Sequence, residues 1–135
     1  MKRLSILLII LLSLFLICQA GDSQDEDKKY GSRYFNPLTL VTINGSIGKI
    51  IQSKRSGVHI SLKTLNGKIE VYLGPVYYVN TKITLYRGDK VEVVGSQVTI
   101  DGKIVIIAKS IQKGDKNIIL RHNDGTLLST GIIRL

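Results

Sequence analysis

Histidine is the side chain here best suited to acid–base or metal chemistry, and the 135-residue sequence contains two, His59 and His122. His59 falls in a segment of alternating polar and apolar residues, and His122 falls at a turn. A first-row metal needs three or four convergent ligands, and the single cysteine, Cys18, lies in an N-terminal apolar run. We therefore expect two exposed imidazoles, no metal site, no cofactor, no catalytic residue and no enzymatic activity.

From residue 38 onward, four aspartates lie beside a glycine, and they form a second pattern that could do chemistry. An aspartate in this position commonly bonds its own backbone and stabilises a turn. This interpretation accounts for the pattern without catalysis, so we expect turns at Asp89, Asp101, Asp115 and Asp124.

Basic and aromatic residues supply the candidate binding site. Barrels that bind extended polymers often do so across a sheet face, with aromatic rings as platforms and basic residues nearby. Strand alternation places several such residues on the polar face, opposite the predicted core residues Ile60, Leu62, Ile69 and Val71 of the same strands. We predict that an anionic ligand contacts His59, Lys63, Lys68, Tyr72 and Arg87.

The aromatic residues near Gly74-Pro75 have another explanation. Tyr77 and Tyr78 are placed to pack a short helix over the end of a barrel, which is a common role for aromatic side chains. The alternative partner surface is the basic C-terminal hairpin around Lys113, Lys116 and Arg121.

The elements that must position these residues are β-strands. Val and Ile dominate the apolar set, and the sequence has 13 glycines, 2 prolines and no tryptophan, which favours strands joined by tight turns. Asn66-Gly67 and Asp101-Gly102 are hairpin signals because both residues of such a turn adopt positive φ. Gly45 and Gly48 indicate a bend or bulge in the first strand. We predict strands at residues 38–53, 58–63, 68–73, 91–100, 104–111 and 117–121, and a short helix at 75–79.

This order of elements is typical of an OB-fold, a five-stranded, partly open Greek-key barrel. The long, bent first strand allows one element to pair with both halves of the sheet. We predict an all-β, OB-fold-like barrel with a short helix between strands 3 and 4 and an extra C-terminal hairpin. A plain β-sandwich is the alternative architecture.

The N-terminus has the layout of a secretory signal peptide, with Lys2 and Arg3 before an apolar run at residues 4–17 and the small Ala20 at its exit. The run is short for a membrane span, which needs roughly 20 apolar residues. We therefore predict export to the periplasm. The alternatives are an uncleaved membrane anchor formed by residues 4–18 and lipidation of Cys18.

The domain organisation follows from this interpretation. About 115 exported residues without a disulfide can form one core. Residues 21–37 are polar, charged and without apolar periodicity, which is typical of a flexible linker. We predict a signal peptide at residues 1–20, a flexible linker at 21–37 and one folded domain at 38–135.

The charge balance limits the class of partner. The net formal charge is +9, and from residue 38 onward 14 Lys and Arg stand against 6 Asp and Glu. A basic domain is attracted to anionic surfaces such as lipid headgroups, polysaccharide, nucleic acid or an acidic protein. The alternative is that the lysines only solvate the strands, because they are spread along the chain.

Four segments carry a resemblance to a known family: residues 57–64 (GVHISLKT), 70–75 (EVYLGP), 88–96 (GDKVEVVGS) and 120–125 (LRHNDG). They resemble a family of small exported bacterial OB-fold domains. The chain is also similar to the domain of magnetosome-associated proteins of the MamS and MamX type. This resemblance implies the OB-fold and the exported location, and it implies no agreed chemistry.

Together these patterns predict a non-enzymatic, exported OB-fold domain that binds an envelope protein partner or an anionic ligand. The resemblance adds an alternative, an accessory factor in envelope metal or redox handling. Nucleic-acid binding ranks third, because export separates the chain from cytosolic nucleic acid. We expect membrane contact only if the N-terminal segment stays uncleaved, and the sequence leaves the oligomeric state open.

Overall fold

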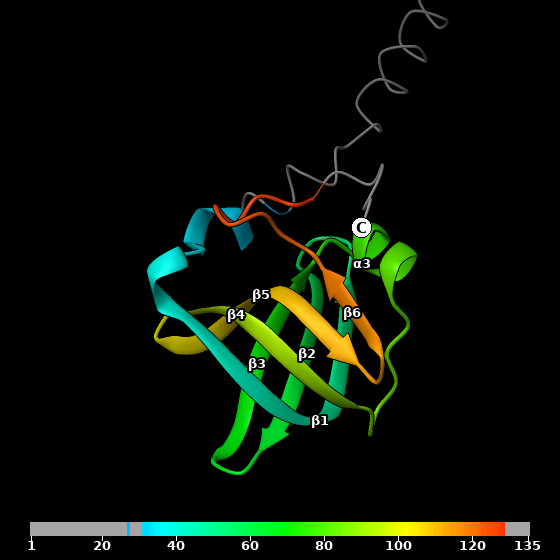
Figure 1. Ribbon diagram of the computed structural model, residues 1–135. Helices are drawn as coiled ribbons and strands as arrows, with labels where there is room; N and C mark the ends of the chain where they lie inside the picture. The colour runs from blue at the N-terminus through cyan, green and yellow to red at the C-terminus, as the bar shows by residue number, and fades with distance from the viewer. Residues whose placement is uncertain (1–26, 28–30, 129–135) are drawn as a thin grey trace, which may run out of the picture.

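A computed structural model describes Asp27 and residues 31–128 of this chain. The strands in the described part occur in the order β3-β2-β1-β4-β5-β6, and β3 also pairs with β5, which closes a barrel of β1 to β5 (Figure 1). The bounds are β1 Leu40–Ser53, β2 Gly57–Thr64, β3 Gly67–Gly74, β4 Lys90–Ile100, β5 Lys103–Lys113 and β6 Lys116–Ile119, with the 3-10 helix η1 at Pro37–Thr39 and the helix α3 at Val76–Lys82.

The first strand joins the two halves of the barrel, as the sequence predicted. β1 pairs with β4 over residues 40–46 and with β2 over residues 46–53. Its register with β2 shifts between Ile47 and Ile50, which is where the strand bends. One strand can therefore belong to both halves because the bend lies near its middle.

The glycines at this bend permit close approach of β1 to β2. A Cβ atom on Gly45 would lie 2.6 Å from the carbonyl oxygen of Lys63, and one on Gly48 would lie 3.0 Å from Ser61 Oγ. A side chain at Gly45 would push β1 away from β2. The register shift lies between Ile47 and Ile50, so the predicted bend is confirmed at Gly48, and Gly45 lies just before it.

Closure distinguishes this barrel from a sandwich. β3 and β5 run parallel, with residues 70–72 opposite residues 105–107. This topology is an OB-fold, with α3 between β3 and β4 and β6 as an additional strand on β5. After β6, Arg121 and Leu127 form an isolated bridge around the predicted last turn. The predicted OB-fold with an extra C-terminal hairpin is confirmed, and the sandwich alternative is wrong.

The two predicted hairpin turns differ in detail. Asp101 and Gly102 both have positive φ, at 51° and 79°. At the other turn Gly67 alone is in this region, with φ of 112°, and the pairing of Thr64 with Gly67 leaves Leu65 and Asn66 as the turn residues. The prediction of positive φ at Asn66 is therefore wrong.

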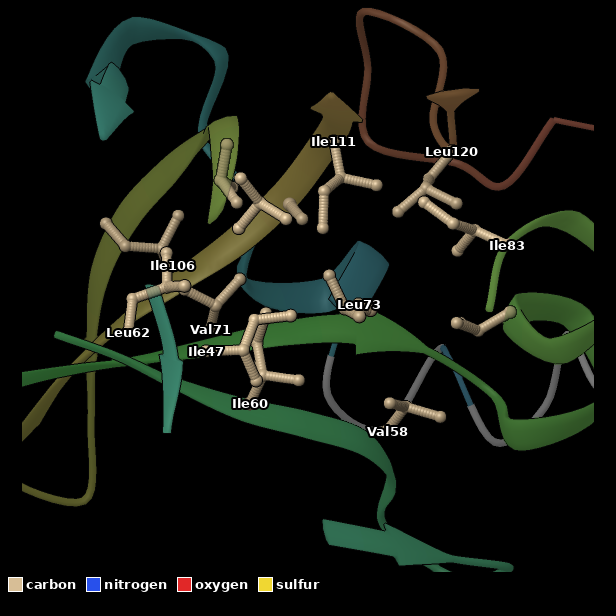
Figure 2. Packing of buried hydrophobic residues seen from close by; sticks show 14 of the residues in the cluster. Ile47, Val58, Ile60, Leu62, Val71, Leu73, Ile83, Ile106, Ile111 and Leu120 are labelled. Atoms are coloured by element: carbon tan, nitrogen blue, oxygen red, sulfur yellow. The ribbon is translucent and has the colours of Figure 1, made fainter. Parts of the chain in front are cut away.

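The core is aliphatic and comes from every barrel strand. Figure 2 shows side chains from separate strands meeting in the interior. Alternation placed Ile60, Leu62 and Val71 inside, and each is at most 1% exposed. Tyr78 of α3 donates from its hydroxyl to the carbonyl oxygen of Leu120 at 2.7 Å, which seats the helix on the barrel end.

The chain before β1 differs from the expected flexible linker. Asp27 is 1% exposed and Phe35 is 8% exposed. Phe35 packs in a second apolar cluster on the outer side of the strands, together with Tyr72, Ile100, Val105 and Ile107. Apolar burial and a buried ion pair, described below, hold these residues, which corrects the expectation for Asp27 and residues 31–36.

The predicted signal peptide and the rest of the predicted linker lie outside the described residues. Within the described part, no helix has both the length and the apolar character needed to cross a membrane.

Candidate functional site

A groove of about 640 Å³ lies on the outer surface between the β2–β3 hairpin and the β4–β5 turn. Barrel closure forms it, because three separate parts of the chain line it: the bend of β1, the strands β2 and β3, and the start of β5. In OB-folds the face of strands 2 and 3 and the loops beside it commonly bind ligands. We call it the basic groove, and its lining includes Lys49, Ile51, Ser61, Lys68, Lys103 and Ile104, with His59 and Glu70.

The basic groove combines positive charge with aliphatic surface. Lys49, Lys68 and Lys103 are exposed and come from three different strands. Ile51 is 48% exposed and Ile104 is 54% exposed, so both present apolar surface to solvent. This arrangement can attract an anion and contact an apolar group beside it.

His59 lies deeper than the sequence suggested. It is 8% exposed, and its Nε2 atom donates to the carbonyl oxygen of Ser56 at 2.7 Å. Its Nδ1 atom lies 3.4 Å from Glu70 Oε1, and its ring centroid lies 5.0 Å from that of Tyr72. The expectation of an exposed imidazole is wrong for His59 because the turn before β2 and the ring of Tyr72 cover it, whereas His122 is exposed.

Tyr72 is not available to a ligand. It is 1% exposed, and its hydroxyl donates to Asp27 Oδ1 at 3.2 Å. Burial, together with the Asp27 carboxylate, raises the pKa of Tyr72 well above its usual range. Alternation placed this ring correctly on the outer face, and the N-terminal segment then covers it. The prediction that Tyr72 contacts a ligand from an exposed face is therefore corrected.

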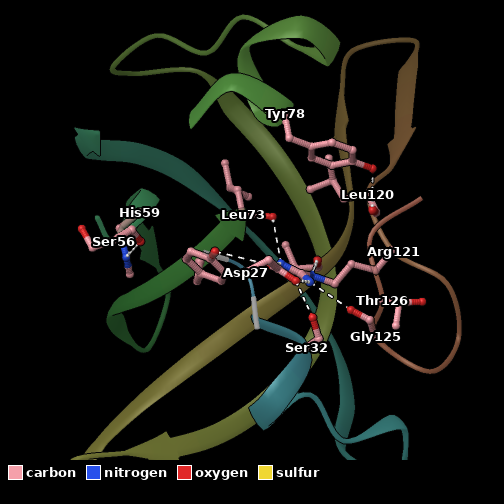
Figure 3. A network of polar contacts seen from close by, with 12 residues as sticks. Asp27, Ser32, Ser56, His59, Leu73, Tyr78, Leu120, Arg121, Gly125 and Thr126 are labelled. Atoms are coloured by element: carbon pink, nitrogen blue, oxygen red, sulfur yellow. Dashed lines mark hydrogen bonds and ion pairs between the residues drawn. The ribbon is translucent and has the colours of Figure 1, made fainter. Parts of the chain in front are cut away.

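Asp27 and Arg121 form a buried ion pair at this covered face (Figure 3). The Nη2 atom of Arg121 donates to Asp27 Oδ1 at 2.6 Å and its Nη1 atom to Oδ2 at 2.7 Å. Ser32 Oγ donates to the same carboxylate at 2.6 Å. Arg121 also donates to the backbone carbonyl oxygens of Ala108, Gly125 and Leu73.

These contacts correct the alternative surface at the C-terminal hairpin. Arg121 is 0% exposed, so it cannot contact a partner. Lys113 forms an ion pair with Asp89 at 2.8 Å and donates to the carbonyl oxygen of Thr84 at 3.1 Å. Lys116 alone of the three is exposed.

A second groove, of about 560 Å³, lies on the other side of the β2–β3 hairpin. Lys63 of β2 and Lys90 of β4 line it, together with Ser46 of β1 and Glu92 of β4. Of the predicted ligand-binding residues, the structure therefore places His59 and Lys68 in the basic groove and Lys63 in the second groove. Arg87 is exposed in the α3–β4 loop and lines neither groove.

Sequence reasoning missed Lys49 and Lys103. Lys49 follows the glycine bend of β1, and Lys103 follows the Asp101-Gly102 turn. The glycines marked both bends, but no local pattern shows that two bends more than 50 residues apart border one groove. Within the described residues, no three His, Cys, Asp or Glu side chains form a group that could hold a metal ion.

Comparison with known proteins gives one family. The MamS/MamX magnetosome protein family matches residues 39–118, which include β1 to β5 and part of β6. No curated protein matches the chain.

The chain is also similar to solved structures. These include a replication protein A heterotrimer bound to ssDNA (16% identity, 58% of this chain and 60% of that chain, TM-score 0.49). They include an S. pombe Stn1-ten1 complex (16%, 62% and 71%, TM-score 0.47) and the OB domain of Ta0387 from Thermoplasma acidophilum (17%, 62% and 83%, TM-score 0.41). At these identities the likeness concerns the fold alone.

Proposed function

The chain belongs to the MamS/MamX magnetosome protein family, and we propose that it is a non-enzymatic, exported binding domain that holds an anionic ligand in the basic groove. One observation carries the proposal: Lys49, Lys68 and Lys103 converge from three strands on one groove. In the described part of the chain none of these lysines forms an ion pair, so their charge is available to a ligand.

The chemistry of the groove supports binding over catalysis. A catalytic site needs a positioned acid, base, nucleophile or metal. The titratable pair in this groove is His59 and Glu70, and the histidine is held through Nε2 by the carbonyl oxygen of Ser56. This contact gives His59 a structural role in fixing the turn before β2.

The proposal is tested by fluorescence anisotropy with the purified protein. The probes are a labelled acidic peptide, a labelled oligogalacturonate and a labelled single-stranded oligonucleotide. We expect at least one probe to bind, with an affinity that falls as salt rises. The variant Lys49→Gln/Lys103→Gln should weaken this binding about tenfold, because each exposed charge contributes up to about 1 kcal/mol.

A matched control is Lys109→Gln/Lys116→Gln, which removes the same charge outside both grooves. It should change the affinity less than about twofold. Equal losses in the two variants would mean that net charge, and not the basic groove, determines binding. Absence of binding by every probe would overturn the proposal.

Metal or redox handling in the envelope is the second candidate, and its support is the family's association with magnetosomes. Metal titration of the parent protein and of His59→Ala/His122→Ala tests it. Stoichiometric binding that the double variant loses would favour this candidate.

A further inference from the structure

A row of lysines crosses the barrel at right angles to its strands. Lys90 of β4 pairs with Ser46 of β1, and Ser46 pairs with Lys63 of β2. Lys63 in turn pairs with Lys68 of β3. Paired residues on neighbouring strands project from the same face of the sheet, so these four side chains share the outer face.

Lys103 extends the row on β5. In the parallel pairing of β3 with β5, Glu70 lies opposite Val105. Lys68 and Lys103 each lie two residues before this pair on their own strands, and both line the basic groove. We call Lys90, Ser46, Lys63, Lys68 and Lys103 the lysine row. It passes through both grooves, with the Lys63–Lys68 pair on the β2–β3 hairpin between them.

The composition of the row indicates a ligand. Like charges directly opposite on neighbouring strands destabilise a sheet, and Lys63 and Lys68 are such a pair. The two grooves contain five lysines and two carboxylates, Glu70 and Glu92, and Glu70 lies 3.4 Å from His59. A bound anion would offset the repulsion, and local departures from favourable pairing are typical of functional sites.

The length of the row requires an extended occupant. Neighbouring strands lie roughly 4.8 Å apart, so Lys90 and Lys68, three strands apart, lie roughly 14 Å apart along the sheet. A single phosphate or carboxylate spans a fraction of this distance. An extended peptide rises about 3.3 Å per residue, so about five residues would cross from one groove to the other.

The surroundings of the row favour a peptide among the extended polyanions. Single-stranded nucleic acids rely on aromatic rings as stacking platforms. Among the described residues that line the two grooves there is no Phe, Tyr or Trp. The exposed apolar side chains there are aliphatic: Ile51, Ile104 and Leu65.

We propose that the lysine row binds an extended acidic peptide segment of a partner protein. The peptide lies across the strands, its carboxylates contact the lysines, and its apolar side chains contact Ile51, Ile104 and Leu65. This inference rests on the proposed function and specifies its ligand.

The experiment compares two pairs of lysines in the full chain. The probe is a labelled twelve-residue peptide with repeats of Glu-Ser-Leu-Glu, and the same peptide with Gln in place of Glu is its control. We expect the acidic peptide to bind and the Gln peptide not to bind. Lys63→Gln/Lys90→Gln and Lys49→Gln/Lys103→Gln should each weaken the acidic peptide about tenfold, whereas Lys109→Gln/Lys116→Gln changes it less than about twofold.

The other outcomes either decide between the two proposals or overturn both. If only Lys49→Gln/Lys103→Gln weakens binding, the groove proposal stands and the lysine row is wrong. If an oligonucleotide or an oligogalacturonate of similar length binds more tightly than the peptide, an anionic groove stands and the peptide assignment is overturned. If no probe binds, both proposals fail. Five of the six lysines are exposed and Lys109 is half-buried, so the variants should fold, and circular dichroism melting verifies this.

Discussion

Arg121 and Asp27, 94 residues apart in the sequence, meet in a bidentate ion pair whose two side chains are 0% and 1% exposed. Residue 27 precedes the barrel and residue 121 follows it, so the pair ties the two ends of the domain together. Tyr72 and Ser32 donate to the same carboxylate. The N-terminal segment is therefore part of the folded domain from Asp27 onward in the residues that are described.

The first prediction concerns this ion pair. Asp27→Asn leaves the buried Arg121 guanidinium without a counter-ion and should lower the free energy of unfolding by about 3–5 kcal/mol. Urea denaturation measures the loss. Asp115→Asn, in the exposed β5–β6 turn, is the matched control and should stay within about 0.5 kcal/mol of the parent. A loss below about 1 kcal/mol for Asp27→Asn would contradict a buried ion pair.

The second prediction is a loss of stability at alkaline pH. Burial raises the pKa of Tyr78 to about 12 and raises that of Tyr72 above its usual range. In the unfolded chain both ionise near pH ~10, so above this pH the folded state holds more protons and the free energy of unfolding falls as pH rises. The contribution is fully present below pH ~10 and, for Tyr78, is lost progressively up to pH about 12.

Denaturation at a series of pH values from 8 upward tests this expectation. Tyr78→Phe should make the alkaline decline shallower, because it removes one of the two ionising groups. Tyr77→Phe is the control, since Tyr77 is 73% exposed on the same helix. An equal decline in the parent and in Tyr78→Phe would show that other groups cause it.

The third prediction separates stability from binding in the lysine row. Lys68→Glu places an opposite charge across from Lys63 and should raise the free energy of unfolding by about 0.2–1 kcal/mol. The same substitution should abolish binding of the acidic peptide. Urea denaturation and anisotropy measure the two effects. A variant that is less stable than the parent would mean that the two lysines do not repel each other.

The fourth prediction compares two glycines with positive φ. Gly67→Val should cost roughly 1–3 kcal/mol, because a β-branched residue is strained there, although no atom lies within 4 Å of the added Cβ position. Gly57→Val should cost more, because its Cβ would also lie 2.6 Å from the Gly74 carbonyl oxygen. Melting temperatures of the two variants give the order. The reverse order would show that β2 and β3 are further apart at Gly57 than the close approach of Gly57 to the Gly74 carbonyl oxygen indicates.

The fifth prediction concerns export. The basic, apolar and small-residue layout of residues 1–20 predicts cleavage after Ala20. N-terminal sequencing of the protein from its host should begin at Gly21. Intact Met1 in the membrane fraction would instead support the uncleaved anchor.

Local patterns in the sequence determined most of the barrel. Alternation assigned Ile60, Leu62 and Val71 to the core, and all are buried. The glycines in the first strand predicted its bend, and the Asp101-Gly102 turn has the expected positive φ at both residues. These signals are readable because the causes, φ preference and strand periodicity, act between residues close in sequence.

Only the tertiary structure decided which part of the outer face is exposed to solvent. Tyr72 and Lys68 lie on the same face of β3, yet Tyr72 is covered by the segment that carries Asp27, and Lys68 stays exposed beside Lys103. Alternation specifies a face but not what packs on it. The parallel pairing of β3 with β5 and the 94-residue separation of Asp27 from Arg121 bring these groups together. Contacts at such separations depend on closure of the whole barrel, which no short segment encodes.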